Sequence, residues 1–153
     1  MYVFKDYYQN EVMLSFEVDP FSSHPKHVFV ICRYHGKWLL TRHKTRGLEF
    51  PGGKVEKNES PEEAALREVY EETGGLVNQL RYLGQYYVDG KGKKVIKNIY
   101  VADIDRLDDV NTYYETHGPV IIEKLPSNLK QSKTYSFIMK DDMIRHSLNQ
   151  LRT

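Results

Sequence analysis

Residues 60–75 read SPEEAALREVYEETGG, which is the clearest helix signal in the chain. Ser60 is a good N-cap, Pro61 suits the first helical position, and Glu63 stands three residues after Ser60, as a capping box requires. The two glycines that close the stretch are typical of a helix end. The pattern therefore predicts a helix over 61–74.

The predicted helix has an unusual concentration of acids. Glu68, Glu71 and Glu72 follow an i, i+3, i+4 spacing, so they share one face, and they lie in the half of the helix where the macrodipole opposes anions. Each like-charge pair at this spacing costs roughly 0.2–0.5 kcal/mol on an exposed helix. We expect no group on that face of the helix to neutralise them. The apolar residues fall on another sector, which we expect to pack into the core: Ala65, Leu66 and Val69.

A divalent cation would explain this acidic face. Hard cations such as Mg²⁺ take oxygen ligands, commonly one or two carboxylates together with waters and substrate phosphates. Just upstream, Gly52-Gly53-Lys54 could bring a backbone carbonyl close to the same ion. The alternatives are a solvated acidic face and an ordinary loop turn. We favour one metal site built from the glycine turn and the helix.

The remaining pattern predicts a layered mixed α/β or α+β domain. With 153 residues we expect a single domain, residues 1–153. Residues 47–53 are expected to form a loop, and a second helix is expected near 139–151. Strand-like segments surround the central helix: 11–18, 27–34, 38–42, 80–88, 94–103 and 120–122.

Composition excludes several classes of protein. The net charge of +1 argues against a polybasic arm that covers the protein. Cys32 is the only cysteine, so neither an intrachain disulfide nor a Cys-x-x-Cys zinc site is possible. No stretch approaches 18 apolar residues and the N-terminus has no apolar signal region. We expect a cytoplasmic protein without a membrane partner.

The region around the helix resembles a known motif. From Gly53 the chain reads Gly, five residues, Glu59, seven residues and then REVYEETG over 67–74. This is similar to GX5EX7REUXEEXGU, the Nudix box of the Nudix hydrolases, and every fixed position matches. Only the last position departs, with Gly75 where the family has an aliphatic residue. The preceding EFPGGK, residues 49–54, resembles the approach segment of the MutT-type branch.

The resemblance implies a fold, a reaction and a set of residues. The fold is an α/β/α sandwich with a mixed sheet, in which the box forms a loop–helix–loop motif. The reaction is hydrolysis of a nucleoside diphosphate linked to another group, with Mg²⁺ or Mn²⁺. The implied roles are metal-binding carboxylates at Glu68, Glu71 and Glu72, a backbone ligand at the Gly52 carbonyl, a helix-orienting pair at Glu59 and Arg67, and a distal acid at Glu115, which is alternatively an ordinary loop residue.

Several substrates and proton acceptors stay open at this point. The first expectation is a nucleoside triphosphate, such as the oxidised purine 8-oxo-dGTP, converted to the monophosphate and pyrophosphate. RNA 5′-triphosphate ends, ADP-ribose and dinucleoside polyphosphates are alternatives, as is a nucleotide-sensing module without catalysis, which the complete glutamate set disfavours. Glu68, Glu71 or Glu115 would take the proton from the attacking water. A monomer and a homodimer both fit the sequence.

The expected substrate contacts are weaker inferences. Gly53 and Lys54 adjoin the metal loop, and Arg42 ends a strand beside it, where a solvated strand end fits as well. Asp141 and Asp142 would read a purine edge or simply cap the second helix. Phe137 would stack on a base or fill the core. The lysines near a predicted hairpin would form a solvated edge or an RNA- or polyphosphate-steering patch: Lys91, Lys93, Lys94 and Lys97.

Overall fold

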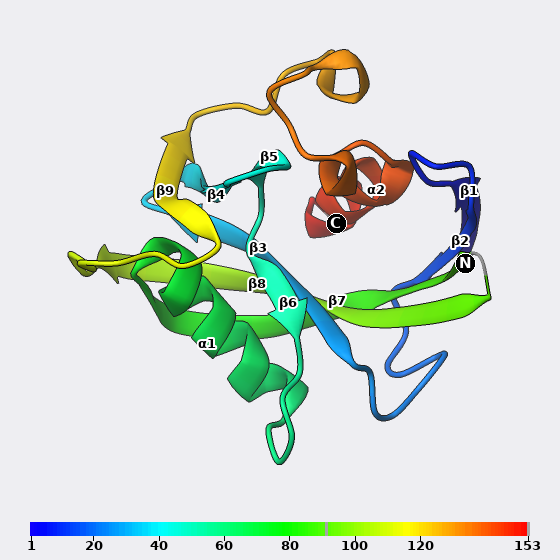
Figure 1. Ribbon diagram of the computed structural model, residues 1–153. Coiled ribbons are helices and arrows are strands. Elements are labelled where there is room, and N and C mark those ends of the chain that lie inside the picture. Colours follow the sequence, from blue (N-terminus) through cyan, green and yellow to red (C-terminus); the bar gives the residue numbers. More distant parts are fainter. Residues whose placement is uncertain (91, 153) are drawn as a thin grey trace.

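The computed structural model describes residues 1–90 and 92–152. Figure 1 shows a twisted sheet with one helix on each side. The helices are α1 (Pro61–Thr73) and α2 (Asp142–Leu151), with 3₁₀ turns η1 (Leu129–Gln131) and η2 (Phe137–Met139) before α2. The strands are β1 (Tyr2–Lys5), β2 (Glu11–Ser15), β3 (His27–Tyr34), β4 (Lys37–His43), β5 (Gly47–Glu49), β6 (Gly52–Lys54), β7 (Gly75–Gly90), β8 (Lys93–Leu107) and β9 (Thr116–Ile122).

The sheet is mixed. Its order is β1-β2-β7-β8-β3-β4-β5, with β6 paired to β3 and β9 paired to β4. β3 runs parallel to β8, and the other strand pairs are antiparallel. This is the expected α/β/α arrangement. In the described part of the chain, no helix is long and apolar enough to cross a membrane.

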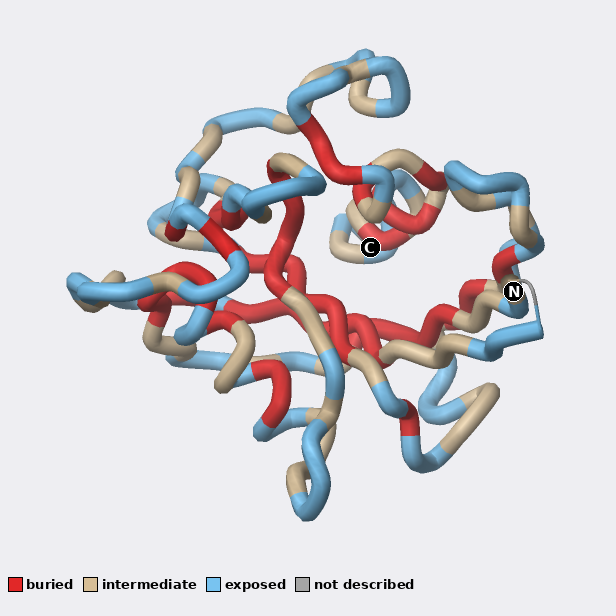
Figure 2. Tube along the Cα trace, viewed as in Figure 1, coloured by how far each residue is buried: buried red, intermediate tan, exposed pale blue. Residues whose placement is uncertain are grey.

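Strand β3 has buried side chains on both faces of the sheet, and each face packs against one helix. Side chains alternate across a strand, so neighbouring residues face opposite layers. Val28 and Val30 are buried in the cluster that contains the apolar face of α1, whereas Phe29 and Ile31 are buried in the cluster that contains Met143 of α2. The buried trace in Figure 2 follows this central strand. A strand covered on both faces reads as a continuous apolar run, as 27–34 does.

Helix α1 begins and ends where the sequence predicts. The Ser60 hydroxyl accepts from the Glu63 backbone N–H at 3.0 Å, and the Glu63 carboxylate accepts from the Ser60 N–H at 2.9 Å. Gly74 is the C-cap, with φ of 76°. The expectation that Leu66 packs into the core was wrong, because its side chain is 43% exposed. Ala64 takes that buried position instead.

The departure from the box at Gly75 has a steric reason. A Cβ atom on this residue would lie 2.9 Å from the Thr73 hydroxyl and 3.2 Å from a Val69 methyl group. The chain leaves α1 directly into β7 against the packed face of the helix, so a larger residue would have to displace that packing.

Two other expectations need correction. The predicted loop over 47–53 contains the short strands β5 and β6, which pair with the edges that β4 and β3 offer. The predicted helix over 139–151 begins only at Asp142, because Asp141 adopts an extended conformation and its carboxylate caps the helix by accepting from the Met143 N–H. The 80–88 and 94–103 strands are longer than expected, and Lys91, which was grouped with the predicted hairpin lysines, lies outside the described residues.

Candidate active site

A cleft of about 510 Å³ opens where β6 and α1 meet the end of β3. Glu68 and Glu72 of α1 contribute carboxylates, which we call the acidic wall, and His27, Arg46 and Lys97 from other elements contribute basic groups, which we call the basic wall. The lining residues are His27, Val28, Phe29, Arg46, Glu49, Phe50, Gly52, Gly53, Lys54, Glu56, Glu68, Glu72, Lys97, Glu115 and Ile138. The cleft therefore unites the glycine turn, the acidic helix and the distal acid that the sequence suggested. Its volume is within the usual range of small-molecule sites.

The acidic wall is formed by Glu72, which is buried, and Glu68, which is partly buried. The Gly52 N–H donates to the Glu72 carboxylate at 3.1 Å, which joins the glycine turn to the helix. Burial, followed by the neighbouring charge of Glu68, raises the pKa of Glu72 to about 9. Burial also raises the pKa of Glu68, although its hydrogen bond from Arg67 opposes the shift. Burial and the proximity of the two carboxylates therefore disfavour a negative charge on both at once.

Arg67 links the acidic residues of the box. Its guanidinium donates to Glu59 from Nε at 2.7 Å and from Nη2 at 3.0 Å, and it contacts Glu68 at 2.6 Å and Glu71 at 3.2 Å. The expectation that nothing on the helix neutralises the acidic face was therefore wrong. The hydrogen bonds from Arg67 lower the pKa of Glu59 to about 2. Glu59 is thus fully ionised and holds Arg67 in place.

The carboxylates of the cleft fit a divalent cation whose coordination is completed by the substrate. Within residues 1–90 and 92–152, no three carboxylate, imidazole or thiol side chains converge closely enough to form a closed metal site. Mg²⁺ usually takes only one or two carboxylates and shares its other positions with waters and phosphates. Glu68 and Glu72, whose shared burial disfavours two negative charges, meet that requirement, and the glycine turn adjoins them.

Glu71 and Glu115 occupy a neighbouring hollow. Glu71 is half exposed and turned toward Arg67, so it does not line the main cleft in this structure. It lines an adjoining cavity of about 210 Å³ with Glu68, Glu72 and Glu115. Glu115 lines both spaces, so the fold brings it beside the box although they are far apart in sequence.

The basic wall contains residues that the sequence did not single out for this purpose. The Lys97 ammonium lies 4.9 Å from the centre of the Tyr86 ring and 5.9 Å from that of Phe29. Burial lowers the pKa of Lys97, with opposing effects from Asp141 and Glu49. Lys97 was expected near a hairpin, either on a solvated edge or in an RNA- or polyphosphate-steering patch. Its spacing of two residues from buried Ile99 was the available signal, since both side chains point to one face of β8.

Arg46 and His27 were also missed. Arg46 donates to the Glu49 carboxylate at 3.0 and 2.9 Å, and this pairing raises the pKa of Arg46. Burial and then Lys97 lower the pKa of His27, whose buried Nδ1 has no hydrogen-bond partner among the described groups. No local motif in the sequence marks either residue, because the cleft forms only when β3 meets the 44–50 segment.

The residues that were expected to bind substrate lie in three places. Gly53 and Lys54 line the cleft, and Arg42 is an exposed residue of β4. Asp141 and Asp142 line a separate cavity of about 530 Å³ beside α2. The buried Asp141 carboxylate accepts from the Tyr86 hydroxyl at 2.9 Å as well as capping α2, and Asp142 pairs with Lys130. Their proposed base-reading role stays a prediction.

Comparisons with known proteins give a consistent assignment. Residues 23–113 match the family described as NUDIX domain. The chain is 61% identical over 152 residues to "Putative 8-oxo-dGTP diphosphatase YtkD" of Bacillus subtilis, covering 99% of this chain and 96% of that protein. It superposes on the crystal structure of the Bacillus subtilis pyrophosphohydrolase BsRppH (E68A mutant) with a TM-score of 0.98 and 60% identity, again covering 99% and 96%. An RNA pyrophosphohydrolase of Aliivibrio fischeri is 40% identical over 55 residues, covering 35% of this chain and 32% of that protein. The chain belongs to the Nudix hydrolase family.

Proposed function

We propose that the protein uses Mg²⁺ or Mn²⁺ to hydrolyse a nucleoside 5′-triphosphate to the monophosphate and pyrophosphate. The observation that supports this most directly is that one cleft is lined both by the carboxylates of Glu68 and Glu72 and by a basic wall that includes Lys97. Carboxylates alone would repel a triphosphate. A cation held by one wall and ammonium or guanidinium groups on the other suit a polyanion.

The chain supplies positions and proton transfer for this reaction. A bound cation lowers the pKa of a water ligand and offsets charge on the phosphates. Glu68, Glu72 and the Gly52 carbonyl are proposed to hold it, with Glu71 joining if it leaves Arg67. Lys54 and Lys97 are proposed to bind the phosphates. Glu68, Glu71 and Glu115 are the candidates for accepting the proton of the attacking water.

Two substrate classes follow from the relatives. YtkD is named for 8-oxo-dGTP, and the Aliivibrio protein is named for RNA. A free oxidised purine nucleotide and an RNA 5′ end both present a triphosphate, so the same residues can perform the same step on both. We propose free nucleotides as the first substrate class and RNA ends as the second. The similarity to the pyrophosphohydrolase BsRppH favours the second class.

We also propose that residues 1–153 form one domain that works in the cytoplasm. One sheet runs through the described strands from β1 to β9, which supports a single unit. The sequence has one cysteine, and Cys32 is buried, as suits a reducing compartment.

A substrate panel tests the proposed reaction. Purified protein is incubated with dGTP, 8-oxo-dGTP, ADP-ribose and a triphosphorylated RNA oligomer, each with Mg²⁺, Mn²⁺ or EDTA, and the phosphate products are identified. We expect pyrophosphate and monophosphate only with metal, and a loss of turnover by orders of magnitude in Glu72→Gln. Glu63→Gln is the matched control on the same helix, because glutamine also completes a capping box. A folded wild-type protein that releases pyrophosphate from none of the triphosphates would refute the proposal.

A further inference from the structure

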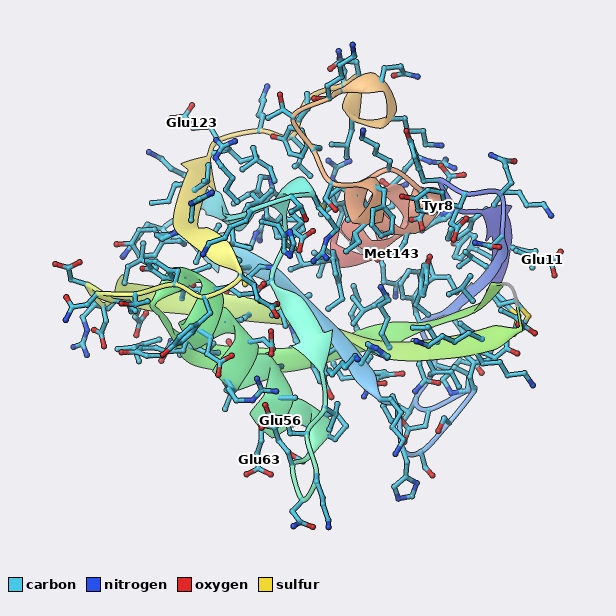
Figure 3. All side chains as sticks on the ribbon, in the orientation of Figure 1. Tyr8, Glu11, Glu56, Glu63, Glu123 and Met143 are labelled. Atoms are coloured by element: carbon cyan, nitrogen blue, oxygen red, sulfur yellow. The ribbon has the colours of Figure 1, made fainter. Side chains whose placement is uncertain are left out.

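Two buried threonines of the sheet hold the last turn of α1. The last four carbonyl groups of a helix have no partner within the helix. One of them, the Glu72 carbonyl, accepts from the Thr41 hydroxyl of β4 at 2.9 Å and from the Thr116 hydroxyl of β9 at 3.3 Å. Figure 3 shows β9 starting beside this end of α1, which is opposite to the end with Glu63, and running toward Glu123. We call Thr41 and Thr116 the threonine pair.

The two hydroxyl groups belong to one hydrogen-bonded unit. The Gly118 N–H donates to the Thr116 hydroxyl oxygen at 3.2 Å, so this oxygen accepts from Gly118 while its hydrogen points to the Glu72 carbonyl. The Thr41 hydroxyl also lies 3.1 Å from the Gly118 carbonyl, which shares its hydrogen with Glu72. Both threonines are buried, so water does not compete for these bonds. Gly118 thus joins the pair against the end of α1.

An irregularity in β9 turns Thr116 toward the helix. In the pairing of β4 with β9, Thr41 lies opposite Pro119 and His43 lies opposite Thr116. The chain advances by two residues along β4 and by three along β9, so β9 carries one extra residue. Such a bulge re-aims side chains and is frequent beside active sites. Gly118 has a φ of 91° within it, a conformation that favours glycine.

Thr116 also links two acidic residues of the candidate site. It directly follows Glu115, whose backbone carbonyl accepts from the Lys44 N–H at 3.1 Å. Glu115 and Glu72 line the same hollow of about 210 Å³. The bond from the Thr116 hydroxyl to the Glu72 carbonyl is therefore the short connection between the strand that carries Glu115 and the helix that carries Glu72.

We propose that the threonine pair positions Glu72 and Glu115 for metal binding and catalysis. This inference rests on the proposed function, because it gives these two carboxylates their task. Glu72 is fixed at both ends, since its carboxylate accepts from the Gly52 N–H at 3.1 Å while its carbonyl accepts from the threonine pair. The pair acts through Glu72 and Glu115, so Thr41 and Thr116 are positioning residues and not ligands.

The first test removes a hydroxyl but keeps a β-branched side chain. In Thr116→Val and in Thr41→Val we expect kcat for a triphosphate to fall about tenfold or more with little change in KM, as for groups that orient metal ligands. Thr116→Ser and Thr41→Ser keep the hydroxyl and should retain most of the wild-type kcat. Tyr82→Phe is the control, because it also removes a hydroxyl that donates to a backbone carbonyl, that of Glu17 at 2.6 Å. Thermal melting sets an assay temperature at which every variant is folded.

A double-mutant cycle separates positioning from a general loss of stability. Because Thr116 acts partly through Glu115, the variant Thr116→Val/Glu115→Gln should lose clearly less kcat than the product of the two single losses. Structural damage unrelated to Glu115 would act independently, and the two losses would multiply. That result would overturn the inference, and so would equal kcat in the valine and serine variants.

Metal binding provides a measurement without turnover. Mn²⁺ alone is titrated calorimetrically into each variant, and we expect Kd to rise about tenfold or more in the two valine variants but not in the serine variants or Tyr82→Phe. An unchanged Kd and an unchanged kcat in the valine variants would overturn the inference and leave hydrolysis intact. If the wild type hydrolyses no triphosphate, the proposed function fails, whereas a rise in Kd confined to the valine variants would still support the positioning of Glu72. A wild type that neither binds Mn²⁺ nor hydrolyses a triphosphate would refute both.

Discussion

Arg67 and Glu59 form a two-pronged ion pair, with 2.7 Å from Nε and 3.0 Å from Nη2 to the two carboxylate oxygens. Nη2 also donates to the Lys54 carbonyl at 2.9 Å. One guanidinium therefore joins the middle of α1 to the loop before it and to the glycine turn. The relative position of the two parts of the candidate metal site depends on this contact.

Arg67→Lys should impair catalysis more than folding. Lysine keeps the charge but cannot make the paired hydrogen bonds of a guanidinium, so the glycine turn and Glu68 lose their common anchor. We expect kcat/KM for a triphosphate to fall by about 10- to 100-fold, as for residues that orient metal ligands. Steady-state kinetics and circular dichroism check this, with exposed Arg145→Lys as the control. Wild-type activity in Arg67→Lys would contradict the role.

Glu72→Gln should change how the metal-free protein responds to pH. The folded-state pKa of about 9 lies above the ordinary carboxyl value of 4.5, so the folded protein binds this proton more tightly than the unfolded chain. Glu72 therefore favours folding fully at low pH, and this contribution is lost as pH rises from about 4.5 to 9. In EDTA at pH 8 the glutamine variant should melt about 5 °C or more above wild type. The difference should disappear near pH 4, and equal melting temperatures at pH 8 would refute this account.

Lys97→Met should weaken substrate binding. Methionine can keep the packing over Tyr86 and Phe29 but removes the ammonium group from the basic wall. We expect KM for a triphosphate to rise about tenfold or more, in the range of a lost hydrogen bond to a charged group, with a smaller change in kcat. Exposed Lys94→Met is the matched control on the same strand. A KM that is equal in both variants would place Lys97 outside the substrate site.

Gly53→Ala should displace the acidic wall. A Cβ atom at this position would lie 2.5 Å from a Glu68 carboxylate oxygen and 2.6 Å from its carbon. The side chain of Glu68 can move away, so we expect little loss of stability but weaker Mg²⁺ or Mn²⁺ binding and lower kcat. Calorimetric metal titration and thermal melting check this. Gly90→Ala, whose Cβ would lie 3.1 Å from the nearest atoms, those of the Asn10 side chain, is the control. Unaltered metal binding would argue against Glu68 as a ligand.

Glu115→Gln should lower kcat with little effect on folding. The residue is exposed and lines both the cleft and the hollow beside Glu68 and Glu72, so its carboxylate can reach a metal ion or an attacking water there. We expect at least a tenfold loss of kcat, since general acid–base groups contribute about 10²–10⁴-fold and a ligand would cost a similar factor. Exposed Glu123→Gln is the control. Equal kcat in the two variants would leave Glu115 as an ordinary loop residue.

The candidate site divides into a part that local sequence predicts and a part that it does not. The capping box of α1 and the common face of its glutamates depend on residues within one or two helical turns, so their spacing is enough to predict them. The expectation that no group on the helix neutralises those glutamates was wrong, because Arg67 reaches them. Its hydrogen bond to Glu71 is an ordinary i, i+4 contact, which helix geometry alone allows.

The acidic helix and the family motif are properties of consecutive residues, and the sequence alone determined them. The tertiary structure decided which groups face that helix. Short strands β5 and β6 exist because β4 and β3 present free edges, and Lys97 enters the cleft because β8 lies parallel to β3. Tyr8 meets Phe137 only when the two ends of the chain pack together. Hydrogen-bond edges and burial are supplied by residues distant in sequence, so no local spacing encodes the basic wall.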